Sequence, residues 1–445
     1  MIPHLVASGL RPMLSLVSTR RRRHIRVLSG RWQRRAIFLC GGIVVGAAVV
    51  ALALLADDAQ RAFARLLALS HEAALAVTPL GFGLSVYLTR RFFPNSQGSG
   101  IPQAIAARRL VDQTERGKLV SLRIAIGKIL LTLLGLLCGA SAGREGPSVQ
   151  VGASIMFAVG RMSPRRQPGL ILAGAAAGVA AAFNTPLAGI VFGIEEMSRA
   201  FEVRTSGLII GGVIAAGLTS LALLGNYTYF GTSAAALTSG TGWLAVPVCG
   251  AVGGLFGGIF SRILIALAAG IPGPLGHAIR RQPILFAMAC GLAVAGSGLL
   301  SGGMIYGTGY AQVKAALENG APLPWSFGPL KMAATALTAV SGIPGGIFSP
   351  SLAVGAGLGI DVGYFFPNVP PGALILLGMV SYFAGVVQAP ITAFVIVTEM
   401  TNNHAMMVPL MAAALIGYAT SRLICREGVY HALAKKFLQP AGRGG

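Results

Sequence analysis

GREGPSVQVG, at residues 143–152, sets Arg144 and Glu145 between glycines inside a very apolar chain. Of the 445 residues, 54% are hydrophobic and only 11% are charged. Soluble globular domains carry about 25% charged residues, so this composition indicates an integral membrane protein. A charge inside an apolar stretch of such a chain therefore needs a physical reason.

Several apolar runs are long enough to cross a bilayer, which takes about 20 residues per α-helix. These runs are 36–56, 74–93, 121–140, 169–194, 243–270, 284–300 and 406–423, and shorter ones broken by Gly and Pro lie near 148–160, 342–365 and 372–398. The 62 glycines permit close helix packing. They also allow helices that stop partway across the membrane, as in the midplane sites of secondary transporters. We expect an all-α membrane protein.

The net charge of +22 would suit nucleic acid, but its distribution excludes that partner. Basic residues flank the apolar runs: Arg20, Arg21, Arg22, Arg23, Arg26, Arg31, Arg34 and Arg35 precede the first, and Arg422, Arg426, Lys435 and Lys436 lie at the end of the last. By the positive-inside rule both termini are cytoplasmic. Residues 1–35 are predicted to be a basic cytoplasmic arm that touches anionic lipid, and 426–445 a short cytoplasmic tail.

Cysteine usage gives no sign of metal or redox chemistry. Cys40, Cys138, Cys249, Cys290 and Cys425 occur singly in or beside apolar runs, without C-x-x-C spacing. Such cysteines are typical packing residues. We expect no metal and no cofactor.

The chain repeats itself at a shift of about 203 residues. GPSVQVGA (146–153) is similar to SPSLAVGA (349–356), GSG (98–100) falls opposite SGG (301–303), and FNTPLAGIVFGIEEM (183–197) is similar to VQAPITAFVIVTEM (387–400). Three matched landmarks indicate a duplicated membrane half. The predicted halves are 36–225 and 226–425, and the residues alone leave open whether they are parallel or inverted.

The repeat separates scaffold residues from candidate site residues. Glu195 recurs as Glu399, so we expect it to order a helix end. Three residues do not recur: Glu145 faces Phe348, Glu196 faces Met400, and Ser99 faces Gly302. These unmatched polar residues are the candidate functional positions.

Four Gly-rich stretches resemble loops that enter helices: GSGIP (98–102), GREGP (143–147), GGMIYGTG (302–309) and GIPGGIFSP (342–350). Proline is tolerated in the first helical turn because its missing N–H has no partner there. A helix start offers free N–H donors and a partial positive charge, which together attract an anion without a formal cation. The alternative is that these glycines serve only helix packing.

The Glu145 carboxylate lies beside a helix start, at the position where a transported anion would bind. When ionised it blocks the site, and when protonated it can leave. The alternative is a helix cap paired with Arg144.

Glu196 at the end of an apolar helix suggests a proton route, because membrane carboxylates often carry protons. Its alternative is an interface residue paired with Arg199.

GSGIP, GREGP, GGIFSP and the EEM/TEM pair together closely resemble the CLC family of chloride channels and chloride/proton exchangers, over about residues 36–437. The resemblance implies a homodimer in which each subunit holds its own pore between two inverted halves of tilted, broken helices. Intact GREGP argues against the fluoride branch. The prokaryotic exchanger branch implies a multi-pass protein of the cell inner membrane.

The resemblance also assigns roles. Ser99 would be the central chloride ligand with Tyr430 of GVYHAL as hydroxyl partner, and the amides of Ile347 and Phe348 would complete this site. Glu145 would be the gating glutamate, with the Gly146 amide at an outer chloride site. Glu196 would transfer protons internally, which favours exchange over a passive channel. Serine in GSGIP favours chloride over nitrate.

One departure from the family concerns the residues after GSGIP. Bacterial exchangers often continue with acidic residues, whereas this chain continues QAIAARR (103–109), so Arg144 is expected to lack a buried acidic neighbour.

A passive chloride channel of the same fold remains an alternative. An intramembrane hydrolase with Ser99 as nucleophile would need a base within reach, and His4, His24, His71, His277, His404 and His431 lie in tails or at span edges. We expect no enzyme.

Overall fold

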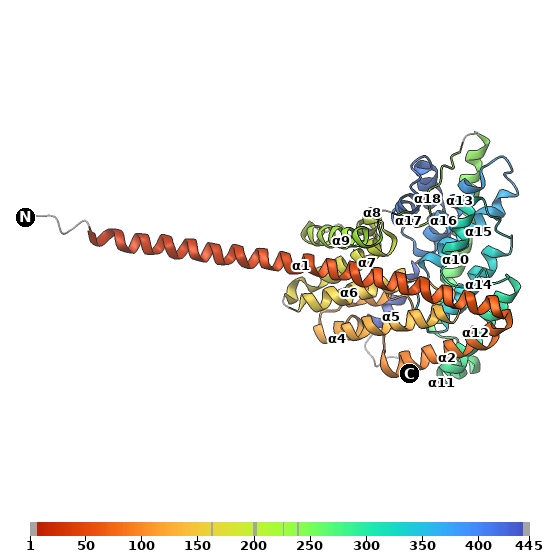
Figure 1. Ribbon diagram of the computed structural model, residues 1–445, viewed down its shortest axis with the longest axis horizontal. Helices are drawn as coiled ribbons and strands as arrows, with labels where there is room; N and C mark the ends of the chain where they lie inside the picture. Colours follow the sequence, from red (N-terminus) through yellow and green to blue (C-terminus); the bar gives the residue numbers. More distant parts are fainter. Residues whose placement is uncertain (1–6, 162, 199–202, 226, 238–239, 439–445) are drawn as a thin grey trace, which may run out of the picture.

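The computed structural model describes residues 7–161, 163–198, 203–225, 227–237 and 240–438. Within these ranges the chain is helical, and β-type pairing is limited to two isolated bridges, Gly98 with Pro344 and Gly143 with Gly346. Figure 1 shows the helices gathered into one body, from which the N-terminal part of α1 extends. The expected all-α class is confirmed for these residues.

The helices fall into two sets. In the first half they are α1 (Ala7–Leu69), α2 (Ala74–Phe92), α3 (Ile101–Arg109), α4 (Gln113–Leu119), α5 (Leu122–Leu137), α6 (Glu145–Gly160), α7 (Gln167–Phe183), α8 (Pro186–Phe192) and α9 (Val203–Leu224). In the second half they are α10 (Ala245–Ala269), α11 (Pro274–Arg281), α12 (Pro283–Leu300), α13 (Tyr310–Asn319), α14 (Phe327–Val340), α15 (Phe348–Gly363), α16 (Pro371–Val387), α17 (Pro390–Thr401) and α18 (Met407–Ile424), followed by α19 (Val429–Leu438). Short 3-10 segments are η1 (His71–Ala73), η2 (Pro164–Arg166) and η4 (Thr241–Leu244), and η3 (Gly193–Ser198) is a π-helix.

The sequence repeat is also a repeat of helices. α5, α6, α7, α8 and α9 recur in order as α14, α15, α16, α17 and α18. Corresponding helices also touch one another, because α2 packs on α12, α6 on α15 and α8 on α17. Contacts between equivalent elements are what a two-fold relationship between two copies produces. The two halves are therefore related by an approximate two-fold axis that passes between these pairs.

Among the described residues, six helices are long and apolar enough to cross a membrane: Ala36–Leu69, His71–Phe92, Gln113–Leu137, Gly242–Ala269, Pro283–Leu300 and Met407–Ile424. They correspond to six of the seven expected spans. The prediction of one continuous span over 169–194 is wrong. Asn184 takes a left-handed conformation with φ 56° and ends α7, and α8 begins at Pro186. Gln388, with φ 60°, ends α16 before Pro390 in the same way.

The centre of the body is formed by α7 and α16, whose residues are almost all buried. Their close packing depends on glycine. A Cβ on Gly152 of α6 would lie 2.2 Å from the Gly174 oxygen of α7, and one on Gly355 of α15 would lie 2.4 Å from the Gly378 oxygen of α16. Small residues let membrane helices approach at their backbones. The glycines thus hold each short helix, α6 and α15, against the core.

Two predicted regions, the N-terminal arm and the C-terminal tail, have boundaries that differ from the helices of the structure. The expected border between arm and membrane half, at 35/36, falls inside α1. The expected tail, 426–445, contains α19, in which Tyr430 and His431 are buried. α19 packs on α3, so α19 lies beside the loop that carries Ser99.

Candidate functional site

Three of the four Gly-rich stretches converge, and each enters a helix as expected. The loop before α3 pairs with the loop before α15, since Gly98 N–H donates to the Ile343 oxygen at 3.1 Å. The loop before α6 also pairs with it, because Gly143 and Gly346 exchange N–H···O bonds of 2.7 and 2.8 Å. Three helix starts, those of α3, α6 and α15, therefore surround one small region. Their unpaired N–H groups favour an anion there.

The fourth stretch, 302–309, lies elsewhere. It leads into α13 and is held against residue 140, because Gly307 N–H donates to the Ala140 oxygen at 3.1 Å. It lines a separate cavity together with Asp57 and Gln60. Its glycines therefore do not join the helix starts around Ser99.

Ser99 and Tyr430 both reach a cavity of about 750 Å³, which we call the Ser99 vestibule. Both hydroxyl oxygens are buried, and neither has a hydrogen-bond partner within the described part of the chain. A Cβ on Gly146 would lie 2.3 Å from the Ser99 Oγ, so only glycine leaves room at this start of α6. Two unsatisfied hydroxyl donors beside a helix start form a site that suits an anion.

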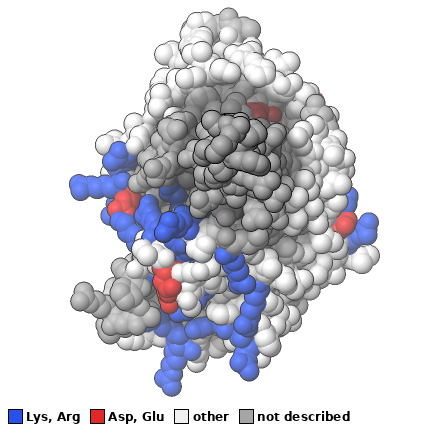
Figure 2. All heavy atoms as spheres, turned by 90° about the vertical axis from the view of Figure 1, so that its left-hand side faces the viewer, with Lys and Arg blue, Asp and Glu red and all other residues white. Residues whose placement is uncertain are grey.

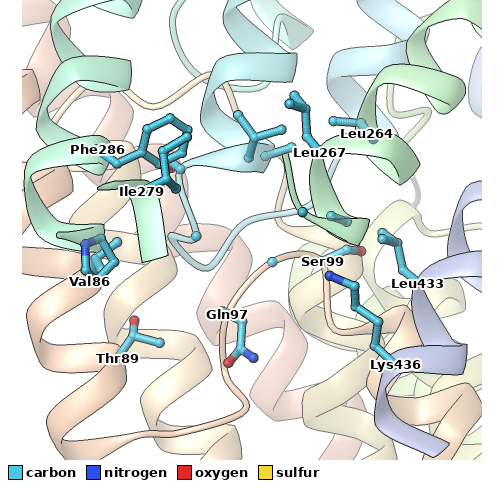
Figure 3. A pocket seen from close by; sticks show the side chains of 18 of the residues that line it. Val86, Thr89, Gln97, Ser99, Leu264, Leu267, Ile279, Phe286, Leu433 and Lys436 are labelled. Carbon is cyan, nitrogen blue, oxygen red and sulfur yellow. The ribbon is translucent and has the colours of Figure 1, made fainter. Parts of the chain in front are cut away.

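The Ser99 vestibule is basic at its rim. Arg280 and Lys436 line it, and Figure 3 shows the Lys436 side chain pointing toward Ser99. Partial burial lowers the pKa of Lys436 below its ordinary value. Positive charge at a cavity mouth raises the local concentration of anions.

Lys128 fixes the loop that carries Ser99. Its ammonium group is fully buried in α5 and donates to the Ser96 and Gly98 oxygens at 2.6 and 2.7 Å. Lys331, its counterpart in α14, donates to the Ile305 and Gly307 oxygens, both at 2.7 Å. Sequence reasoning missed this pair, although both lysines lie in apolar runs at the offset of the repeat.

Glu145 is fully buried and lies against the start of α15, the counterpart of its own helix. Its Oε2 accepts the Ser349 N–H at 3.4 Å, and its Oε1 accepts the Tyr229 hydroxyl at 3.3 Å. The carboxylate thus occupies a helix start, the position that an anion would take. The structure records no hydrogen bond or ion pair between Glu145 and Arg144, whose guanidinium group instead bonds Asp57 and the Ala53 oxygen.

Arg144 has an acidic neighbour after all. Its Nη1 donates to Asp57 Oδ1 and to the Ala53 oxygen, both at 2.6 Å. The Arg144 side chain is 6% exposed and that of Asp57 is 44% exposed. We expected Arg144 to lack a buried acidic neighbour, and the acid that it meets, Asp57 of α1, is half-exposed and comes from a distant part of the sequence.

Tyr229 is a site residue that the sequence did not reveal. It lies in the connection between the halves, is buried, and packs edge-on against Phe183 and Tyr310. The Arg144 guanidinium lies 5.6 Å from its ring centre. Tyr229, Tyr310, Arg144 and Asp57 line a cavity of about 220 Å³, which we call the Tyr229 vestibule. The aromatic cluster NYTYF (226–230) is the signal that could have drawn attention to it.

Ile347 and Phe348 stand at the start of α15, as the N-cap residue and the first helical residue. Their N–H groups belong to the donors that have no intrahelical acceptor. The Phe348 ring packs against Phe383 with ring centres 4.2 Å apart. This packing holds the start of α15 against α16.

Glu196 lies in the π-helix η3 and is 2% exposed. π-helical turns frequently mark functional sites. Its Oε1 lies 3.0 Å from His431 Nδ1, and His431 is also buried. Both residues line a further cavity, of about 670 Å³, which we call the Glu196 vestibule. Arg199, the other partner considered for Glu196, lies outside the described residues.

Comparison with known proteins identifies the family. The family model described as "Voltage gated chloride channel" matches residues 81–422. The "H(+)/Cl(-) exchange transporter ClcA" of Yersinia pseudotuberculosis is 33% identical over 89% of this chain and 86% of its own length. Its namesake from Vibrio parahaemolyticus is 31% identical over 82% and 80%.

The chain belongs to the CLC family. Solved CLC structures have the same fold. A slow cyanobacterial Cl⁻/H⁺ antiporter superposes with a TM-score of 0.77 at 24% identity, over 92% of this chain and 99% of that one. A CLC-type fluoride/proton antiporter gives a TM-score of 0.76 at 23% identity, over 90% and 97%. The two halves are thus the inverted repeats of the CLC fold.

Proposed function

We propose that this protein is a secondary-active chloride/proton antiporter. The observation that supports this most directly is the buried Glu145 carboxylate, which accepts the Ser349 N–H at the start of α15 and the hydroxyl of Tyr229, a residue that lines the Tyr229 vestibule. A titratable carboxylate at an anion-binding position couples chloride movement to proton movement, because protonation of Glu145 removes the negative charge that excludes chloride. The relatives named as exchange transporters support this choice.

The chloride path runs through the converging helix starts. Chloride enters the Ser99 vestibule and binds the hydroxyls of Ser99 and Tyr430 and the amides of Ile347 and Phe348. It then moves to the Gly146 amide and to the position at the start of α15 that Glu145 leaves when it is protonated. These neutral donors bind the ion firmly enough for entry and weakly enough for release. Serine at 99 favours chloride over nitrate.

On the proton path, Glu196 is the internal residue that binds and releases the proton. Glu196 is buried beside its own vestibule, and the residues lining that cavity do not line the Ser99 vestibule. Protons and chloride therefore reach the protein by separate entrances and meet at Glu145. Separate entrances suit an exchanger, because the two ions travel in opposite directions.

The topology is proposed on charge. Lys and Arg gather on the face from which α1 leaves the body (Figure 2), and the turn between α6 and α7 exposes Arg161, Arg165 and Arg166. By the positive-inside rule this face is cytoplasmic, as are both termini, in the cell inner membrane. Residues 1–35 form the arm, 36–225 and 226–425 the two repeats, and 426–445 the end of the chain. A homodimer with one pathway per subunit follows the family.

The test is reconstitution of the purified full chain into liposomes with a chloride gradient and an external pH electrode. An antiporter uses the chloride gradient to drive protons uphill, and collapse of the membrane potential by valinomycin leaves this coupling intact. A passive chloride channel of the same fold moves chloride without uphill protons. Chloride flux without proton pumping over pH 4 to 8 would overturn the proposal in favour of the channel.

A further inference from the structure

Adjacent side chains of α19 line two different cavities. Tyr430, Leu433 and Lys436 line the Ser99 vestibule, whereas His431 and Lys435 line the Glu196 vestibule. Two successive turns of one helix, 430–436, thus line both cavities. Tyr430 belongs to the proposed chloride site, which leaves the role of His431 open.

His431 has the geometry of a relay rather than of a packing residue. Its Nδ1 lies 3.0 Å from Glu196 Oε1, and its Nε2 is buried without a hydrogen-bond partner within the described residues. An imidazole buried only for structure would normally satisfy both ring nitrogens, because an unpartnered buried polar atom is costly. The second nitrogen is available for a proton or a water molecule from the vestibule.

The vestibule beside the pair is large enough for many waters, since one water occupies about 30 Å³ and the cavity measures about 670 Å³. The charged groups that line it with Glu196 and His431 are Arg109, Glu195, Arg422, Arg426, Glu427 and Lys435. Glu195 is engaged with the start of α17, and Glu427 with Lys435. Arg108 of α3 donates to the Met197 oxygen and to Ser198.

We propose that His431 and Glu196 form a two-residue proton relay, in which His431 exchanges protons with the vestibule and Glu196 exchanges them with the interior. A proton binds Nε2 as the Nδ1 proton moves to Glu196 Oε1. An O–H bond of a protonated vestibule water breaks as the N–H bond forms at Nε2, and the N–H bond at Nδ1 breaks as an O–H bond forms at Glu196 Oε1. A neutral imidazole then faces a neutral carboxylic acid. Release toward the vestibule reverses these steps. Imidazole is suited to this because it changes protonation between pH 5 and 8.

This inference rests on the proposed exchange function and is tested in the same liposomes with wild-type protein, His431→Asn, His431→Gln and His404→Asn. Asparagine puts an amide N–H near the Nδ1 position, and glutamine puts one near Nε2, but neither amide titrates. His404 is exposed and lies outside the three vestibules, so His404→Asn controls for loss of a histidine.

We expect His431→Asn to keep chloride flux within about twofold while uphill proton transport falls at least tenfold, since a positioned acid–base group contributes about 10²- to 10⁴-fold. The remaining proton flux should lose its dependence on the pH of the vestibule side. Wild-type coupling with an unchanged pH profile in His431→Asn or His431→Gln would overturn the relay. Loss of chloride flux in both variants would make His431 a structural residue and overturn it as well. Failure of wild-type protein to pump protons would instead overturn the exchange function itself.

Discussion

Glu195 and Glu399 each stabilise the start of the helix segment that leads to the other. Glu195 Oε1 and Oε2 accept the N–H groups of Ile391 and Thr392 at 3.1 and 2.6 Å, where α17 begins, and α17 carries Glu399. Glu399 accepts those of Leu187 and Ala188 at 3.1 and 2.6 Å, where α8 begins, and α8 runs into η3 with Glu195. The exchange is reciprocal, as a two-fold axis requires. The expectation that Glu195 orders a helix end is confirmed, and the helix end lies in the other half.

Removing either carboxylate should weaken the contact between the halves. Glu195→Ala should lower the free energy of unfolding by about 1–3 kcal/mol, because its charge-assisted hydrogen bonds are lost, including the part-buried ones from Thr392. Glu399→Ala should cost less, since Glu195 also accepts the Thr392 hydroxyl. Thermal unfolding in detergent measures both. Glu115→Ala, which removes an exposed pair with Lys118, should change the midpoint little, and equal midpoints for all three variants would contradict this account.

Glu145→Gln should move chloride without protons. The amide has nearly the shape of the protonated acid, so it neither competes with chloride for the start of α15 nor carries a proton. Liposome assays of both ions should give a proton-to-chloride ratio of zero with chloride flux retained. Proton pumping against a gradient by this variant would remove Glu145 from the coupling step.

Tyr229→Phe should speed chloride transport. The hydroxyl holds the Glu145 carboxylate in its seat, and one such hydrogen bond is worth about 1 kcal/mol, or about fivefold in rate or occupancy. Chloride efflux from liposomes measures the change. Tyr306→Phe provides the control, because its buried hydroxyl bonds the Ala295 oxygen away from the pathway. Slower efflux in Tyr229→Phe would show that the tyrosine does not hold the gate closed.

Ser99→Pro should shift preference from chloride toward nitrate by about tenfold, because redirected amide N–H groups change hydrogen bonds to the anion that are each worth about 1.5–3 kcal/mol. Proline removes the hydroxyl and, by fixing φ, changes the direction of the neighbouring amides. Ser99→Ala removes the hydroxyl alone and should weaken chloride binding without favouring nitrate. Relative flux of the two anions is the measurement, and an unchanged ratio in Ser99→Pro would exclude Ser99 from selectivity.

Glu196→Gln should keep chloride flux and abolish proton movement. Glutamine is nearly isosteric and can still accept a hydrogen bond from His431, so the fold should survive, but it cannot hold and release a proton. Glu195→Gln, one residue earlier, should keep coupled exchange because Glu195 serves a helix start. Uphill proton transport at the wild-type ratio in Glu196→Gln would contradict the proposed proton path.

The sequence alone revealed much of the architecture and half of the site. Composition indicated a membrane protein because a bilayer imposes long apolar helices. The repeat at about 203 residues exposed the two halves and set Glu145, Glu196 and Ser99 apart as unmatched polar residues. Glycine and proline marked the helix starts, since their backbone preferences are local. These properties are written along the chain, so they need no knowledge of the fold.

The partners of those residues were decided by tertiary structure alone. Asp57 and Arg144 lie 87 positions apart, Glu145 and Tyr229 84, and Glu196 and His431 235. No local period or spacing links residues at such separations. The two-fold packing of the halves brings α1, the inter-half connection and α19 to the site, and low-dielectric burial then makes each of these pairings matter. The charges inside GREGP are thus explained by contacts that only the folded chain makes.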